Sequence, residues 1–146
     1  MIKVVIFEDI ADIREFLSET IRSSDELQLM GAYPNAIEVV EIIKHKNPDV
    51  VLMDLQMPGI TGVEAIRLVK QEMLNVQLLV QTVFEDNAHI FAAICAGASG
   101  YILKDSTPER YIEAIIETYH GGSPMPPTIA RKVLTMFQTQ NQSVIN

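Results

Sequence analysis

Three carboxylates stand at the ends of two apolar runs of the sequence. Glu8 and Asp9 follow residues 2–7, and Asp54 closes the run that begins at residue 50. Carboxylates held close together raise one another's pKa and destabilise a fold unless a cation lies among them. Mg²⁺ suits that position, because it takes hard oxygen ligands and keeps several of its waters. These residues therefore predict a magnesium site, provided that the fold brings the two runs side by side.

Two more side chains at the ends of apolar runs suit a phosphoryl group. Thr82 closes residues 76–82 and offers a hydroxyl donor, whereas Lys104 follows residues 100–103 and offers a fixed positive charge. An aspartate beside a metal ion, a lysine and a hydroxyl can accept a phosphoryl group. Taken singly, a strand-end acid caps the next helix, a threonine is an ordinary strand residue and a lysine is a solvated charge. Only the whole set, gathered at one edge, indicates this chemistry.

The segments around these residues predict five strands that alternate with five helices. The expected strands are residues 2–7, 27–33, 50–54, 76–82 and 100–103. The expected helices are a segment from Ile10 onward, one around residues 39–46, residues 61–73, residues 86–98, and one that Thr107-Pro108 opens and Gly121-Gly122 close. Continuous apolar strands among amphipathic helices are typical of a parallel sheet covered on both faces. We therefore expect an α/β fold, a flavodoxin-like (βα)5 doubly wound sandwich on a five-stranded parallel sheet. Ligands of such sheets bind beyond the carboxyl ends of the strands, where the strand order reverses.

The composition is that of an ordinary globular domain. Of 146 residues, 48% are hydrophobic and 21% are charged, which is enough to form one core. No apolar run approaches the roughly 18–20 residues of a membrane span, and the N-terminus lacks the pattern of a signal peptide. Cys95 is the single cysteine, so a reducing cytoplasm is the expected location. Its position in an apolar helix favours a packing role.

The charge is unevenly distributed and divides the chain in two. The net charge of −8 argues against nucleic-acid binding by this chain, because phosphate contacts need clustered bases. All 19 acids lie in the first 122 residues, and Arg131 and Lys132 are the only charged residues after them. We therefore expect one domain over residues 1–122 and a separate piece over residues 123–146. In that piece Pro126-Pro127 precede an apolar stripe that predicts a linker helix, and the last ten residues, "FQTQNQSVIN", have the composition of a linker or tail.

Four motifs make a resemblance to a known family specific. "FED" follows the first strand, "MDLQMPGITGVEA" contains Asp54, "VQTVFED" contains Thr82 and "AGASGYILKD" contains Lys104. They resemble the receiver (CheY-like) domain of two-component response regulators, over about residues 2–122. "AGASGYILKD" and the following "GGSPMPPTIARKVL" resemble the NarL/LuxR-type transcriptional regulators in particular.

The resemblance implies a role for each acid. Asp54 would be the phosphate acceptor, receiving the phosphoryl group from the phosphohistidine of a histidine kinase. Asp9, Asp54 and the backbone carbonyl of Gln56 would bind Mg²⁺ directly, and Glu8 would act through a water. The family more often has two aspartates where this chain has Glu8-Asp9.

The resemblance also implies a switch. Thr82 and Lys104 would each bind a phosphoryl oxygen, and the ring of Tyr101 would turn inward as Thr82 moves toward the phosphate. The alternative for Tyr101 is an edge-strand ring with its hydroxyl in water. Gln56 and Phe84, each two residues beyond a site residue, would tune the lifetime of the phosphate, with Phe84 shielding it from water.

Partners follow from the same resemblance. A sensor histidine kinase would phosphorylate the domain, which would not be an enzyme but an acceptor with slow self-dephosphorylation. Phosphorylation would favour a homodimer, and DNA would be bound only through a C-terminal helix-turn-helix domain absent from this chain. No membrane partner is expected. A truncated chain accounts for the linker helix and tail better than a natural single-domain regulator does.

Three other functions compete with this interpretation. A flavodoxin-type FMN protein shares the topology, but Glu8-Asp9 would repel its phosphate. A haloacid-dehalogenase-type phosphatase requires a second acid two residues beyond its nucleophile, where this chain has Gln56 or Ala11. The strongest competitor is a receiver that no longer accepts phosphate and serves as a binding module.

Overall fold

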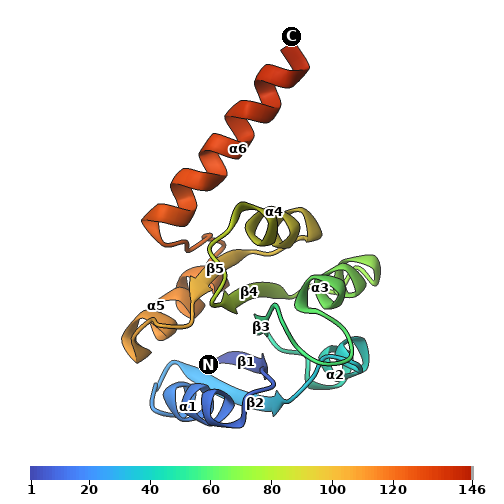
Figure 1. Cartoon of the computed structure of the whole chain (residues 1–146). Helices are drawn as coiled ribbons and strands as arrows, with labels where there is room; N and C mark the ends of the chain where they lie inside the picture. The colour runs from blue at the N-terminus through green and yellow to red at the C-terminus, as the bar shows by residue number, and fades with distance from the viewer. Residues whose placement is uncertain (146) are drawn as a thin grey trace.

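The computed structural model describes the backbone of residues 1–145 and the side chains of residues 1–139. Within these residues five strands form one sheet, the first five helices flank it, and the sixth projects away from it (Figure 1). The strands are β1 (Ile2–Phe7), β2 (Leu27–Tyr33), β3 (Val50–Asp54), β4 (Gln77–Thr82) and β5 (Gly100–Leu103). The helices are α1 (Ala11–Arg22), α2 (Val39–Lys46), α3 (Gly62–Gln71), α4 (Asn87–Ala96), α5 (Pro108–Tyr119) and α6 (Pro127–Ile145). The predicted alternation of strands and helices is confirmed.

The sheet brings the ends of β1 and β3 together. Its strands are all parallel and lie in the order β2-β1-β3-β4-β5, so the order reverses between β1 and β3. Phe7 pairs with Met53 across these two strands. The residues that follow, Glu8 and Asp54, therefore emerge side by side at the carboxyl edge, where such sheets bind ligands.

Helices cover both faces of the sheet (Figure 1). Val4 and Ile6 of β1 point to the face covered by α1 and α5. Val5 and Phe7 point to the other face, which α2, α3 and α4 cover. This alternation follows from the two-residue period of a strand, and it explains why the strands are apolar on both sides. The doubly wound sandwich expected from the sequence is confirmed.

Side-chain caps fix the starts of the helices near the carboxyl edge. Thr61, Asp86 and Thr107 each accept a hydrogen bond from a backbone N–H in the first turn of α3, α4 and α5. The helix predicted over residues 61–73 is too long at its end, because α3 stops at Gln71 and Met73 adopts a left-handed φ of 54°. There the N–H of Leu74 donates to the carbonyl of Val69, which closes the helix as in a Schellman motif.

The α6 helix begins at the predicted proline pair but runs further than predicted. It extends from Pro127 to Ile145, so the backbone of most of the expected linker or tail is helical. Ile129 is fully buried in the same core cluster as α4, and Lys132 donates its Nζ to the carbonyl of Glu85 before α4. This helix is therefore anchored on the sheet domain at its N-terminal end.

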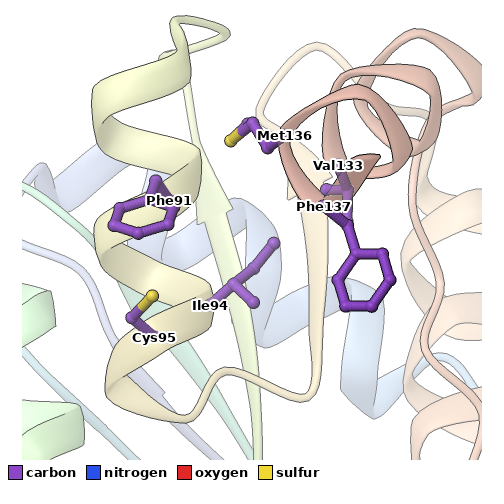
Figure 2. A pocket seen from close by; sticks show the side chains of 6 residues that line it. All are labelled: Phe91, Ile94, Cys95, Val133, Met136 and Phe137. Carbon is purple, nitrogen blue, oxygen red and sulfur yellow. The ribbon is translucent and has the colours of Figure 1, made fainter. Parts of the chain in front are cut away.

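Beyond Ile129, Val133 and Met136 of α6 still pack against this core cluster, and an apolar groove lies between α4 and α6 (Figure 2). Its lining consists of apolar or sulfur-containing side chains from both helices: Phe91, Ile94, Cys95, Val133, Met136 and Phe137. Cys95 is exposed in this groove, so the expected packing role is wrong, because its side chain faces the groove rather than the sheet. No helix in the described part of the chain is both long and apolar enough to cross a membrane.

Candidate functional site

The three predicted acids meet at the carboxyl edge of the sheet. One carboxylate oxygen each from Glu8, Asp9 and Asp54 lies within 4.8 Å of the other two. Glu8 and Asp54 are buried, and Asp9 is half-buried. This proximity follows from the adjacency of β1 and β3, because Glu8 and Asp54 come directly after Phe7 and Met53, which pair across the two strands.

Lys104 reaches this cluster from the end of β5. Its Nζ lies 2.7 Å from Glu8 Oε1 and 3.1 Å from Asp54 Oδ2, and its backbone N–H donates to the carbonyl of Thr82. Thr82 is buried at the end of β4, where its Oγ1 accepts a hydrogen bond from the N–H of Phe84 at 3.2 Å. A cavity at this edge is lined by two of the acids and by residues that end or follow the strands: Asp9, Ile10, Ile13, Asp54, Gln56, Thr82, Val83, Phe84 and Lys104.

The pKa values of the two buried acids, Glu8 and Asp54, shift in opposite directions. Burial raises the pKa of Glu8, but the hydrogen bonds from Lys104, Gln81 and Ile10 outweigh it and leave that pKa below its usual value. For Asp54, burial and the nearby charge of Glu8 outweigh the attraction of Lys104 and raise the pKa to about 7. The pKa of Lys104 is raised, because its two carboxylate partners outweigh its burial. Lys104 therefore stabilises the negative charge of Glu8 more than that of Asp54. The charge of Asp54 is the less well compensated of the two.

The loop after β3 folds back onto Asp54. The N–H of Gln56 donates to Asp54 Oδ1 over a long 3.4 Å, and the N–H of Gly62 donates to the carbonyl of Leu55 at 2.8 Å. A Cβ on Gly62 would collide with the backbone carbonyl of Asp54. Glycine therefore allows α3 to begin directly against the acceptor strand, and Gln56 itself is exposed at the rim.

Tyr101 lies inside the protein. Its ring is 1% exposed, and its hydroxyl donates to the carbonyl of Phe84 at 2.8 Å. The alternative with the hydroxyl in water is therefore not what the structure has. Burial, together with the charges of Asp86 and Glu85, raises the pKa of Tyr101. The ring of Phe84 stacks on that of His89 with centroids 3.8 Å apart, so the loop between β4 and α4 is held from several sides.

Three residues at the site were missed by the sequence analysis. Gln81 donates its Nε2 to Glu8 Oε1 at 2.8 Å, and the hydroxyl of Tyr111 donates to Gln81 Oε1 at 3.2 Å. Arg14 donates to the carbonyls of Glu8 and Asp9. A signal existed for Gln81, since an amide inside the apolar run "LLVQT" requires a buried partner. For Tyr111 and Arg14 no comparable signal exists, because both lie on ordinary amphipathic helices.

The donor set fits a magnesium ion. All three acids offer hard carboxylate oxygens, and Lys104 alone cannot neutralise them. Burial and the charge of Glu8 raise the pKa of Asp54, and a divalent cation among these oxygens would offset both effects.

Residues 4–116 match the family model of the response regulator receiver domain. The chain belongs to this family. Receiver domains are signalling proteins rather than conventional enzymes, and they typically bind Mg²⁺ at an acidic pocket such as the one formed by Glu8, Asp9 and Asp54.

Relatives of this receiver domain include transcriptional regulatory proteins and response regulators. It is 34% identical to the transcriptional regulatory protein LnrK of Bacillus subtilis over 97% of this chain and 64% of LnrK. It is 32% identical to the response regulator GacA of Pseudomonas aeruginosa over 96% of this chain and 66% of GacA. The chain thus spans less than two thirds of the length of these relatives.

Solved structures of the same kind superpose closely on the receiver domain. A LuxR-family two-component response regulator from Aurantimonas sp. SI85-9A1 gives a TM-score of 0.84 at 29% identity, over 92% of this chain and 96% of that one. The signal receiver domain of the putative response regulator NarL from Mycobacterium tuberculosis gives 0.79 at 28% identity, over 82% and 97%. The NarL/LuxR-type resemblance of the sequence is confirmed.

Proposed function

We propose that Asp54 accepts a phosphoryl group from the phosphohistidine of a sensor histidine kinase. A carboxylate oxygen of Asp54 forms the new P–O bond, and the P–N bond breaks, with the imidazole nitrogen keeping the electron pair. The observation that carries this proposal is the position of Asp54, which is buried at the switch point beside two other acids and 3.1 Å from Lys104. A bound Mg²⁺ would supply positive charge for the transferred oxygens.

The surrounding residues divide the remaining tasks. Asp9, Asp54 and the carbonyl of Gln56 would hold Mg²⁺, while Glu8 would act through a water. Glu8 already accepts three hydrogen bonds from the protein, which leaves about one of its four acceptor positions for such a water. Thr82 and Lys104 would each bind one phosphoryl oxygen.

Acetyl phosphate and Mg²⁺ test this function directly. The intact mass of the wild-type protein should increase by one phosphoryl group, and Asp54→Asn should abolish the increase because the nucleophilic oxygen is gone. Asp12→Asn, which alters an exposed acid in the first turn of α1, should behave as wild type. A wild-type protein that gains no mass would make the domain a binding module rather than a phosphate acceptor.

We further propose that phosphorylation acts on α6. The loop between β4 and α4 carries both the Phe84 carbonyl that Tyr101 contacts and the Glu85 carbonyl that Lys132 contacts. A shift of Thr82 toward the phosphate would disturb these neighbouring contacts together. Residues 1–122 would then be the receiver, and residues 123–146 would pass the change to a DNA-binding domain such as the relatives' role in transcription implies.

Self-association would complete this output. Exposed apolar side chains of α4 and α6, namely Phe91, Leu134 and Phe137, make these helices a candidate surface for a homodimer formed on phosphorylation. Two copies would bring two DNA-binding domains onto paired half-sites. The cytoplasmic location expected from the sequence stays a prediction.

Phe84→Ala should shorten the lifetime of the phosphorylated protein several-fold. The side chain lines the site cavity with Asp54 and Thr82, so its removal opens a path for water to a phosphate that otherwise hydrolyses slowly. The backbone carbonyl of Phe84 remains available to Tyr101. Decay of the phosphorylated mass over time measures the effect, with Leu68→Ala, an exposed apolar side chain of α3 that does not line the cavity, as the control. Equal half-lives for Phe84→Ala and wild type would contradict the shielding role.

A further inference from the structure

We propose that Gln81 and Tyr111 form a buried relay that positions Glu8 for the magnesium site. All three side chains are essentially inaccessible to solvent, with exposures of 0% for Glu8 and Gln81 and 1% for Tyr111. Gln81 comes from β4 and Tyr111 from α5, so the relay runs from the helix layer to the acid cluster on the face of the sheet that α1 and α5 cover. This inference rests on the proposed function only in assigning Glu8 to the metal.

The relay has a defined direction. The ionised carboxylate of Glu8 can only accept hydrogen bonds, so it takes the Nε2 end of the Gln81 amide, 2.8 Å from Glu8 Oε1. The hydroxyl of Tyr111 donates to the other end, Gln81 Oε1, at 3.2 Å. Tyr111 therefore satisfies the buried amide oxygen and holds the Gln81 side chain in place against Glu8.

The neutral amide of Gln81 can hold the Glu8 carboxylate without opposing the binding of a cation, which Lys104 cannot do. Lys104 also contacts Glu8 Oε1, but its positive charge competes with a divalent ion for the same acids. The Gln81 amide holds the carboxylate in one rotamer without cancelling its charge. If Lys104 turns to a phosphoryl oxygen, Glu8 still keeps its bonds from Gln81 and from the N–H of Ile10. Partners of this kind behind a metal site typically change metal affinity by about 10–100-fold.

Calorimetric titration of the unphosphorylated protein with Mg²⁺ alone tests the relay. Gln81→Leu should raise the dissociation constant about tenfold or more, and Tyr111→Phe should raise it by a smaller factor. The double variant Gln81→Leu/Tyr111→Phe removes both buried polar partners, which keeps the core apolar and folded, and should bind Mg²⁺ as weakly as Gln81→Leu. Thr118→Val removes another buried hydroxyl of α5, one that donates to the carbonyl of Ala114, and should leave the dissociation constant unchanged.

A double-mutant cycle separates positioning from general damage to the core. Glu8→Asp shortens the side chain by one methylene and withdraws it from Gln81, so Gln81→Leu should cost little further affinity in that background. A Gln81→Leu protein that binds Mg²⁺ as wild type does, or a loss that persists in full with Glu8→Asp, would overturn the relay. The titration needs no phosphate, so it can fail while acetyl phosphate still labels Asp54, and it can succeed if no labelling occurs.

Discussion

Asp54→Asn should make the metal-free protein more stable at about pH 8, by roughly 2–4 kcal/mol. The folded protein holds the proton of Asp54 up to a pKa of about 7, because burial and the charge of Glu8 oppose ionisation. The unfolded chain releases that proton near the ordinary value of 3.8. Between these values the folded state binds more protons, so stability falls as the pH rises. Asparagine resembles the protonated acid and avoids this loss.

The pH dependence distinguishes this effect from a general improvement in packing. Urea unfolding in the presence of EDTA should give a gain for Asp54→Asn that is fully present above about pH 7 and shrinks toward zero at about pH 4. Mg²⁺ should reduce the stability advantage of Asp54→Asn over wild type at high pH, because the ion binds and stabilises the wild-type carboxylates. A gain that is the same at both pH values, or a destabilised variant, would show that Asp54 is not electrostatically strained.

Lys104→Met should destabilise the metal-free protein by about 3–5 kcal/mol, the usual cost of leaving a buried charge without its partner. Lys104 is the cation that directly pairs with Glu8 and Asp54, and its side chain is only 11% exposed. Its removal leaves two buried carboxylates facing each other, with the neutral donors of Ile10 and Gln81 on the Glu8 carboxylate. The loss should diminish on adding Mg²⁺, because a divalent ion can replace the missing charge.

A surface lysine provides the matched comparison for this variant. Lys44 lies 3.8 Å from Glu72, and both side chains are about half exposed. Lys44→Met should therefore change the free energy of unfolding by no more than about 0.5 kcal/mol. Denaturant unfolding of both variants measures the contrast, and similar losses for the two would mean that Lys104 contributes no more than a solvated ion pair.

The fold and the position of the acids could be predicted because each depends on local patterns. Apolar strands such as Ile2–Phe7 and Val50–Asp54 are continuous, and parallel strands bring their carboxyl ends to one edge, so Glu8, Asp9 and Asp54 had to approach each other. Thr82 and Lys104 follow the same rule, and their backbones are hydrogen-bonded to each other.

What could not be predicted depends on three-dimensional contacts between distant segments. The Tyr111–Gln81–Glu8 relay joins residues of α5, β4 and β1 that no spacing links. The left-handed backbone conformation of Met73 ends α3, because it lets the N–H of Leu74 reach the carbonyl of Val69. The sequence does not indicate this end, because a methionine rather than a glycine adopts the left-handed conformation. Cys95 sits in an apolar sequence yet faces the groove between α4 and α6, because composition alone does not indicate which side of a helix meets the sheet.

The anchoring of α6 at its root gives this helix the properties of a lever. Its 19 residues extend about 28 Å at the helical rise of 1.5 Å per residue. Its contacts with the core cluster and with Glu85, made by Ile129, Lys132, Val133 and Met136, lie within its first three turns. A small rotation of α6 about these contacts would therefore move its C-terminal end by a much larger distance than its N-terminal end. Displacements too small to change the sheet would then produce a large movement at the end of the helix.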